Sequence, residues 1–118
     1  MKTITLCGSV RFKLFFDLAS ETLQEMGYCV HSLSLFGNGL LGYINDENLM
    51  KPLLEETHFQ KIDQSDAIYV LDIHRYIGKS TAKEISHALE TEKQIHYWSK
   101  DDLGLVTHIM TLLVRSTF

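Results

Sequence analysis

A near-continuous apolar run constrains the fold of this chain more than any other feature. The run reads AIYVLDI at 67–73, and a polar loop and a segment with helical spacing follow it. A strand that is apolar on both faces suits a parallel sheet with helices on both sides. The rest of the chain is therefore expected to supply helices that alternate with further parallel strands.

The hydrophobic pattern alternates between strand and helix along the whole chain. It predicts strands at 3–7, 28–33, 67–73 and 94–98, and helices at 11–26, 47–64, 81–92 and from Asp101 or Asp102 towards Val114. The segment 34–46 has three glycines and no clear period, so a loop is expected there. This order predicts one α/β domain over 1–118, a three-layer flavodoxin- or Rossmann-like fold with a parallel sheet of four or five strands in order 2-1-3-4.

Composition narrows the classes of partner. The chain has 118 residues, 45% of them hydrophobic, and a net charge of −4, which disfavours a nucleic-acid backbone as ligand but leaves small anions open. The first residues lack a secretory signal and no apolar run is long enough for a membrane span, so no membrane partner and a cytoplasmic location are expected. Cys7 and Cys29 fall in expected strands, which favours buried thiols over a disulfide.

The expected strand order also places a ligand site. Open α/β sheets bind ligands beyond the carboxyl ends of the strands where the strand order reverses, here between the first and third strands. The segments 8–11 and 72–81 follow those two strands. Together with the 34–46 loop, they are the expected walls of the site.

The residues after the first strand read Gly8-Ser9-Val10-Arg11. Glycine lets a backbone approach a ligand closely, and helix amides, the Ser9 hydroxyl and the Arg11 guanidinium are all phosphate donors. The alternative is an ordinary strand-to-helix turn in which Ser9 caps the helix.

The loop after the third strand leads through Gly78 and Ser80 to Thr81-Ala82-Lys83-Glu84. Thr81 and Glu84 have the spacing of a capping box, which would make both residues structural. A carboxylate at this end of the sheet is also placed to attack an anomeric carbon and form a glycosyl ester. Both interpretations of Glu84 remain open at this point.

Asp72 ends the third strand, where it either accepts a hydrogen bond from a ligand or binds nearby loop amides. The six histidines have no metal-ligand spacing, so the sequence predicts neither a metal nor another cofactor.

Three of these segments resemble the nucleoside 2-deoxyribosyltransferase-like superfamily, which includes small 2′-deoxynucleoside 5′-monophosphate N-hydrolases. The matching pieces are CGSVR at 7–11, DAIYVLD at 66–72 and IGKSTAKEISHA at 77–88. Within the superfamily the chain looks most similar to small bacterial proteins with a YIG-ST-EI signature, which is found here at 76–85.

The resemblance implies roles for particular residues. It places the family's nucleophile on Glu84, its phosphate-binding residues on Ser9 and Arg11, and its small polar residues before the nucleophile on Ser80 and Thr81. It also implies a homodimer or larger homo-oligomer in which a neighbour's C-terminal segment closes the site.

The chain departs from the family pattern at several positions. A catalytic aspartate of the family falls on His58, and a polar residue six positions before the nucleophile falls on Gly78. Where the family has an aromatic residue on the first strand, this chain has Thr5, and where the family has a glycine two residues after the nucleophile, it has Ser86. His58 is a candidate general acid, since imidazole exchanges protons near neutral pH.

The sequence therefore leads to a first hypothesis, a hydrolase or deoxyribosyltransferase acting on the N-glycosidic bond of a nucleoside or nucleotide, with a 5′-monophosphate preferred. The second is a catalytically silent nucleotide-binding or sensor domain of the same architecture. The third, a receiver-like or TIR-like interaction module, is disfavoured because the first strand lacks the acidic pair of receiver domains.

Overall fold

Four parallel strands form one sheet in the order β2-β1-β3-β4, as the sequence predicts. The computed structural model describes residues 2–32 and 47–116, and the expected 34–46 loop lies outside them. The elements, in chain order, are β1 (Thr3–Gly8), α1 (Lys13–Glu25), β2 (Cys29–His31), α2 (Glu47–Asp63), β3 (Ala67–Leu71), α3 (Lys79–Glu90), β4 (Gln94–Tyr97) and α4 (Leu105–Ser116). All eight expected elements are present, and the described residues hold no fifth strand.

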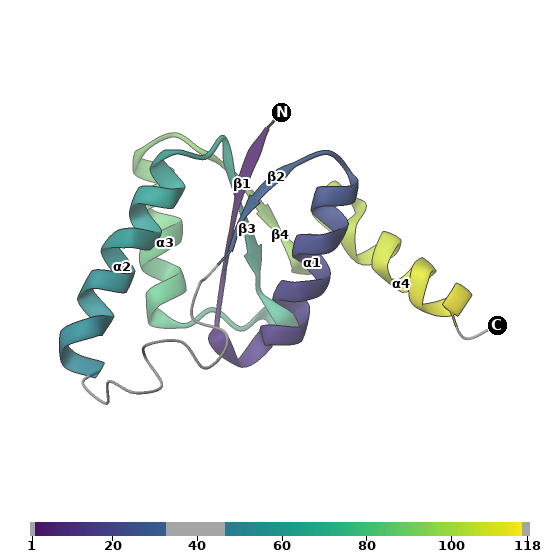
Figure 1. Cartoon of the computed structure of the whole chain (residues 1–118), viewed down its shortest axis with the longest axis horizontal. Helices are drawn as coiled ribbons and strands as arrows, with labels where there is room; N and C mark the ends of the chain where they lie inside the picture. The colour runs from purple at the N-terminus through teal and green to yellow at the C-terminus, as the bar shows by residue number, and fades with distance from the viewer. Residues whose placement is uncertain (1, 33–46, 117–118) are drawn as a thin grey trace.

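Helices cover both faces of the sheet and create two separate apolar layers. In Figure 1, α2 and α3 lie on one side of the strands, and α1 and α4 lie on the other. The core on the α1 side is centred on Leu6, Phe16 and Tyr69, and the core on the α2–α3 side includes Cys7 and Val70. Neighbouring β1 residues therefore serve different layers, as the alternation of side chains along a strand requires.

The third and second strands are both shorter than the sequence predicts. The third strand ends at Leu71, because Asp72 leads into a 3₁₀ turn at Ile73–Arg75. The second strand has only three residues and lies at the edge of the sheet. This edge position explains why Cys29 is exposed, so the expectation that both cysteines are buried is wrong for Cys29 and confirmed for Cys7.

Gly8 allows β1 to end in close contact with its neighbours. It pairs with Leu71 of β3, and a Cβ at this position would lie 3.2 Å from the Leu71 Cβ and 3.3 Å from a ring carbon of Phe16. Only a residue without a side chain avoids this crowding. The strand can therefore turn into the following 3₁₀ turn and α1 while it stays packed against both β3 and α1.

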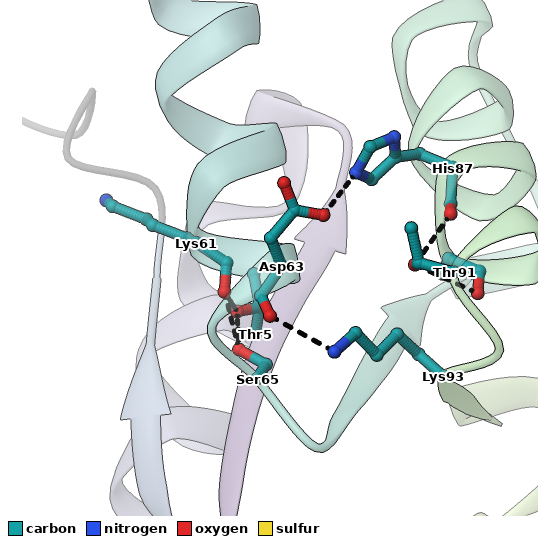
Figure 2. Close-up of polar contacts among 8 residues, drawn as sticks. Thr5, Lys61, Asp63, Ser65, His87, Thr91 and Lys93 are labelled. Carbon is teal, nitrogen blue, oxygen red and sulfur yellow. Dashed lines mark hydrogen bonds and ion pairs between the residues drawn. The ribbon is translucent and has the colours of Figure 1, made fainter.

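Polar contacts fix α2 against α3 and against β1 (Figure 2). The His87 imidazole of α3 lies 2.6 Å from the Asp63 carboxylate at the end of α2, and the Lys93 ammonium donates to the Asp63 carbonyl at 3.1 Å. The Ser65 hydroxyl just after α2 lies 2.5 Å from the Thr5 hydroxyl of β1. These contacts hold the two helices over one face of the sheet.

An aspartate caps the last helix, as the sequence predicts. The Asp101 carboxylate accepts hydrogen bonds from the backbone amides of Val106 and Thr107 at 2.8 and 3.2 Å, and from the Thr107 hydroxyl. The other candidate, Asp102, accepts the backbone amide of Tyr97 instead.

No helix in the described part of the chain combines the length and the apolar character needed to cross a membrane.

Candidate functional site

Three reactive side chains from three elements meet at the carboxyl end of β1. The Cys7 sulfur lies 3.6 Å from His58 Nε2, and the same nitrogen lies 3.5 Å from a carboxylate oxygen of Glu84. Cys7 belongs to β1, His58 to α2 and Glu84 to α3. Their relative exposures are 0%, 3% and 6%, so this cluster is nearly closed to solvent.

The helix that carries Glu84, α3, begins earlier than the sequence suggests. Gly78 is the N-cap and Lys79 the first helical residue, so Glu84 is the sixth residue of the helix rather than the third. The capping-box interpretation of Thr81 and Glu84 is therefore wrong. Both side chains are instead buried, three residues apart, on the face of α3 that covers the sheet.

The cluster contains buried polar atoms that lack partners within the described residues. The second carboxylate oxygen of Glu84 and Nδ1 of His58 accept or donate no hydrogen bond there. A buried polar group without a partner costs free energy, so such atoms in a folded protein call for a functional explanation.

The electrostatics of the cluster keep the Cys7 thiol protonated. Burial raises the pKa of Cys7 well above its usual range, and the Glu84 charge and hydrogen bond raise it further. A thiol is nucleophilic only as the thiolate. The cluster therefore has the composition of a thiol-based catalytic triad but not its electrostatics.

The two loops that the sequence assigns to the site do meet. The Arg11 guanidinium donates to the Tyr76 hydroxyl at 3.3 Å and lies 4.2 Å from the centre of its ring. Left-handed backbone conformations at His74 and Arg75 turn the chain after β3 towards this contact. Strained conformations of this kind concentrate at functional sites.

Other predicted residues have structural partners. Ser9 accepts the backbone amide of Arg11 at 3.3 Å and so caps the 3₁₀ turn Val10–Phe12, in agreement with the structural alternative. Both carboxylate oxygens of buried Asp72 bind Ser99, one to its amide at 2.9 Å and one to its hydroxyl at 2.5 Å. Ser80 is exposed in the first turn of α3.

The structure thus brings the predicted residues together in two groups, the buried cluster with Glu84 and His58 and the exposed pair of Arg11 and Tyr76. Asp72 faces Ser99, outside both groups. Cys7 was not predicted as a functional residue. Its signal is the alternation along β1, which places it with Thr5 on the face covered by α2 and α3.

An open depression of about 390 Å³ lies between α2 and α3. It contains none of the residues that the sequence assigns to the site. Its lining residues are Phe59, Ala82, Lys83, Ser86, His87 and Glu90.

Comparison with known proteins adds no further identification. A scan against protein-family models finds no match to the chain, and a search among curated proteins finds no match either. The family resemblance therefore rests on the sequence motifs alone, and the activity that it implies is a matter for proposal.

Proposed function

We propose that this protein cleaves the N-glycosidic bond of a nucleoside or nucleotide, with Glu84 as the nucleophile. The observation that supports this most strongly is the buried pair of His58 Nε2 and a Glu84 oxygen, 3.5 Å apart, with the second Glu84 oxygen unpartnered among the described residues. Such a carboxylate can act as a nucleophile, and the imidazole beside it is placed to act as a general acid.

The proposed reaction has two steps. The Glu84 carboxylate attacks C1′ of the sugar while the bond from C1′ to the base nitrogen breaks, and the base leaves with that electron pair and takes a proton from His58. The product is a glycosyl ester on Glu84, formed through an oxocarbenium-like transition state. Water, or a second base, then displaces the ester, and His58 recovers the proton from the attacking group.

The phosphate end of the substrate is assigned to the exposed residues near the cluster. Arg11 is a charged donor, and its contact with Tyr76 positions it beside the loop that leads into α3. Ser80 in the first turn of α3 and Ser9 after β1 add hydroxyl donors, and Gly78 at the N-cap of α3 lets the backbone approach the phosphate. This donor set favours a 5′-monophosphate over a nucleoside.

The second candidate is a nucleotide-binding domain without catalysis. The observation that favours it is the loss of one expected acceptor, because Ser99 occupies both oxygens of Asp72. The presence of Gly78 where the family has a polar residue also favours binding without catalysis. In this case Glu84 would bind the sugar without attacking it.

The proposal includes self-association and a cytoplasmic location. Both cysteines are free thiols, as is usual in a reducing compartment.

Met110, Leu112 and Leu113 of α4 are large apolar residues that are 43–54% exposed. Exposed apolar residues grouped on one helix commonly mark a protein interface, and a homodimer buries them without a further partner.

A free-base release assay separates the two candidates. Purified protein, treated with a chelator, is incubated with a panel of ribo- and 2-deoxyribonucleoside 5′-monophosphates and the matching nucleosides. Release of a base identifies the substrate and supports the glycosidase, and His58→Asn should then slow release by roughly 10²- to 10⁴-fold. Saturable binding of a nucleotide without release would overturn the catalytic proposal in favour of the binding domain.

A further inference from the structure

The cluster of Cys7, His58 and Glu84 combines three different metal-ligating side chains. One ligand atom of each residue, a sulfur, an imidazole nitrogen and a carboxylate oxygen, lies within 4.8 Å of the other two. Within the described part of the chain, no other group of three His, Cys, Asp or Glu side chains brings its ligand atoms this close together. All three side chains are more than nine-tenths buried.

Two of the three separations between these atoms match the edges of a tetrahedron around zinc, and the third, from the Cys7 sulfur to the Glu84 carboxylate, is within 4.8 Å. With Zn–S near 2.3 Å and Zn–N and Zn–O near 2.0–2.1 Å, tetrahedral angles separate sulfur from nitrogen by about 3.6 Å and nitrogen from oxygen by about 3.3 Å. The corresponding separations are 3.6 Å from Cys7 Sγ to His58 Nε2 and 3.5 Å from that nitrogen to Glu84 Oε1. Along these two edges an ion would therefore need only small shifts of the side chains.

A buried oxygen without a hydrogen-bond partner also favours a bound cation in the cluster. The second oxygen of Glu84 has no hydrogen-bond partner among the described residues, although it is buried. A carboxylate in a water-poor site is stabilised by a cation more effectively than by the neutral thiol beside it. His58 directs the same nitrogen, Nε2, towards both Cys7 and Glu84. A single ion bound between the three side chains would use this nitrogen as a ligand.

We propose that Cys7, His58 and Glu84 bind one divalent transition-metal ion of the zinc or cobalt type, with a fourth position left open. On binding, the ion displaces the proton of the Cys7 thiol, which is released to solvent, and neutral His58 and ionised Glu84 supply the other two ligands. The sulfur and nitrogen donors select against magnesium and calcium, which prefer all-oxygen sites. Three protein ligands with one open position is the pattern of catalytic rather than structural zinc sites.

This inference does not depend on the proposed glycosidase activity, but the two are linked through Glu84. A carboxylate bound to a metal ion is less able to attack C1′. Zinc is therefore expected to suppress base release by the proposed route, and a chelator to restore it.

Cobalt titration tests the site directly. The full-length protein, cleared of metal by a chelator, is titrated with Co²⁺ under reducing conditions, and absorption is recorded. We expect one ion per chain, a near-ultraviolet band from charge transfer between thiolate and cobalt, and displacement by Zn²⁺ but not by Mg²⁺.

The two cysteines provide a matched pair of variants. Cys7→Ser should abolish the charge-transfer band, whereas Cys29→Ser, at the exposed cysteine, should retain it. Glu84→Gln, made in the Cys29→Ser background, should keep the thiolate band but weaken cobalt binding by at least about tenfold. This last variant preserves side-chain size, so it tests the site even if Cys7→Ser does not fold.

Two results would overturn the inference. One is a wild-type protein without a thiolate–cobalt band, and the other is a band that is lost in Cys29→Ser and retained in Cys7→Ser. Base release is scored separately on chelated protein. Metal binding without base release would support the metal site and contradict the glycosidase proposal. Base release without metal binding would support the glycosidase proposal and contradict the metal site.

Discussion

Cys7 shows how the environment of a single residue decides its chemistry. The same thiol next to an imidazole would be a nucleophile in an exposed, electropositive site. Here burial and the neighbouring Glu84 raise its pKa and keep it neutral. On our proposals, Glu84 is the nucleophile in the absence of metal, and the thiolate forms when a cation replaces the proton.

Gly8 is the residue whose size matters most at the end of β1. We predict that Gly8→Ala lowers the free energy of unfolding by about 1–3 kcal/mol, because the new Cβ would lie 3.2 Å from Leu71. Urea denaturation monitored by circular dichroism measures this change. Gly78→Ala is the comparison, since the atom nearest to its Cβ would be the Tyr76 hydroxyl at 3.4 Å, an ordinary contact distance. An equal loss in both variants would contradict the crowding argument.

At this scale the sequence predicted the position of Glu84 but not its surroundings. Local spacing could not tell a capping box from a buried carboxylate, because the distinction depends on whether the helix begins at Gly78 or near Thr81. Pairing with His58 and Cys7 depends on three elements packing together, which no spacing along the chain encodes. Ser9 shows the opposite case, since its capping role is local and was foreseen as the structural alternative.

At the scale of elements, α4 depends on its cap. Asp101 has a left-handed backbone conformation, φ 50°, and its carboxylate accepts the amides of Val106 and Thr107. The hydrogen bond from the Thr107 side chain lowers the pKa of Asp101 below its usual value. Such a carboxylate compensates the unpaired amides at a helix N-terminus and favours the folded state.

This lowered pKa predicts how the cap depends on pH. Because the folded value lies below the unfolded value of about 3.9, the stabilising contribution is complete above that pH and is lost as the pH falls through the folded value. Asp101→Asn, which tolerates the left-handed conformation, should therefore lower the melting temperature at pH 7 and differ less from wild type in acid. Thermal melts between neutral and acidic pH measure this, with Asp17→Asn on an exposed position of α1 as control. A gap that widens in acid would contradict the sign of this linkage.

The elements themselves were largely predictable. The unbroken apolar run at 67–71 follows from the burial of a strand on both faces. The helical spacing at 81–92 follows from the burial of a helix on one face. Boundaries were less accurate where a turn type decides them, as at Asp72, which the pattern assigned to a strand although it leads into a 3₁₀ turn. Cys29 was misplaced because its strand was treated as a core strand, although the predicted order 2-1-3-4 puts that strand at the edge of the sheet.

At the scale of the whole molecule, the crossover order of the sheet brings the ends of β1 and β3 together. This topology was predictable because four strands that alternate with helices favour few arrangements with right-handed connections. Arg11 and Tyr76 meet as a consequence, although 65 positions separate them in the chain. The activity itself does not follow from the fold, because one fold supports many different sites.

Self-association is a property of this scale. We predict a homodimer in solution that is weakened by Leu113→Lys, because a lysine would place a charge within the exposed apolar residues of α4. Light scattering coupled to size exclusion gives the mass of each species. Leu89→Lys changes a leucine on α3 that is even more exposed, 63% against 46% for Leu113, and should leave the mass unchanged. A monomeric wild type would contradict the prediction.

The central claim, that Glu84 is a nucleophile, is tested most directly by the rate of base release from chelated protein. Glu84→Gln is compared with Glu90→Gln, which alters an exposed glutamate of the same helix. We expect Glu84→Gln to slow release by at least about 10³-fold and Glu90→Gln to leave the rate unchanged. Release that continues at the wild-type rate in Glu84→Gln would show that this carboxylate does not form the glycosyl ester, and the account of the site would be wrong.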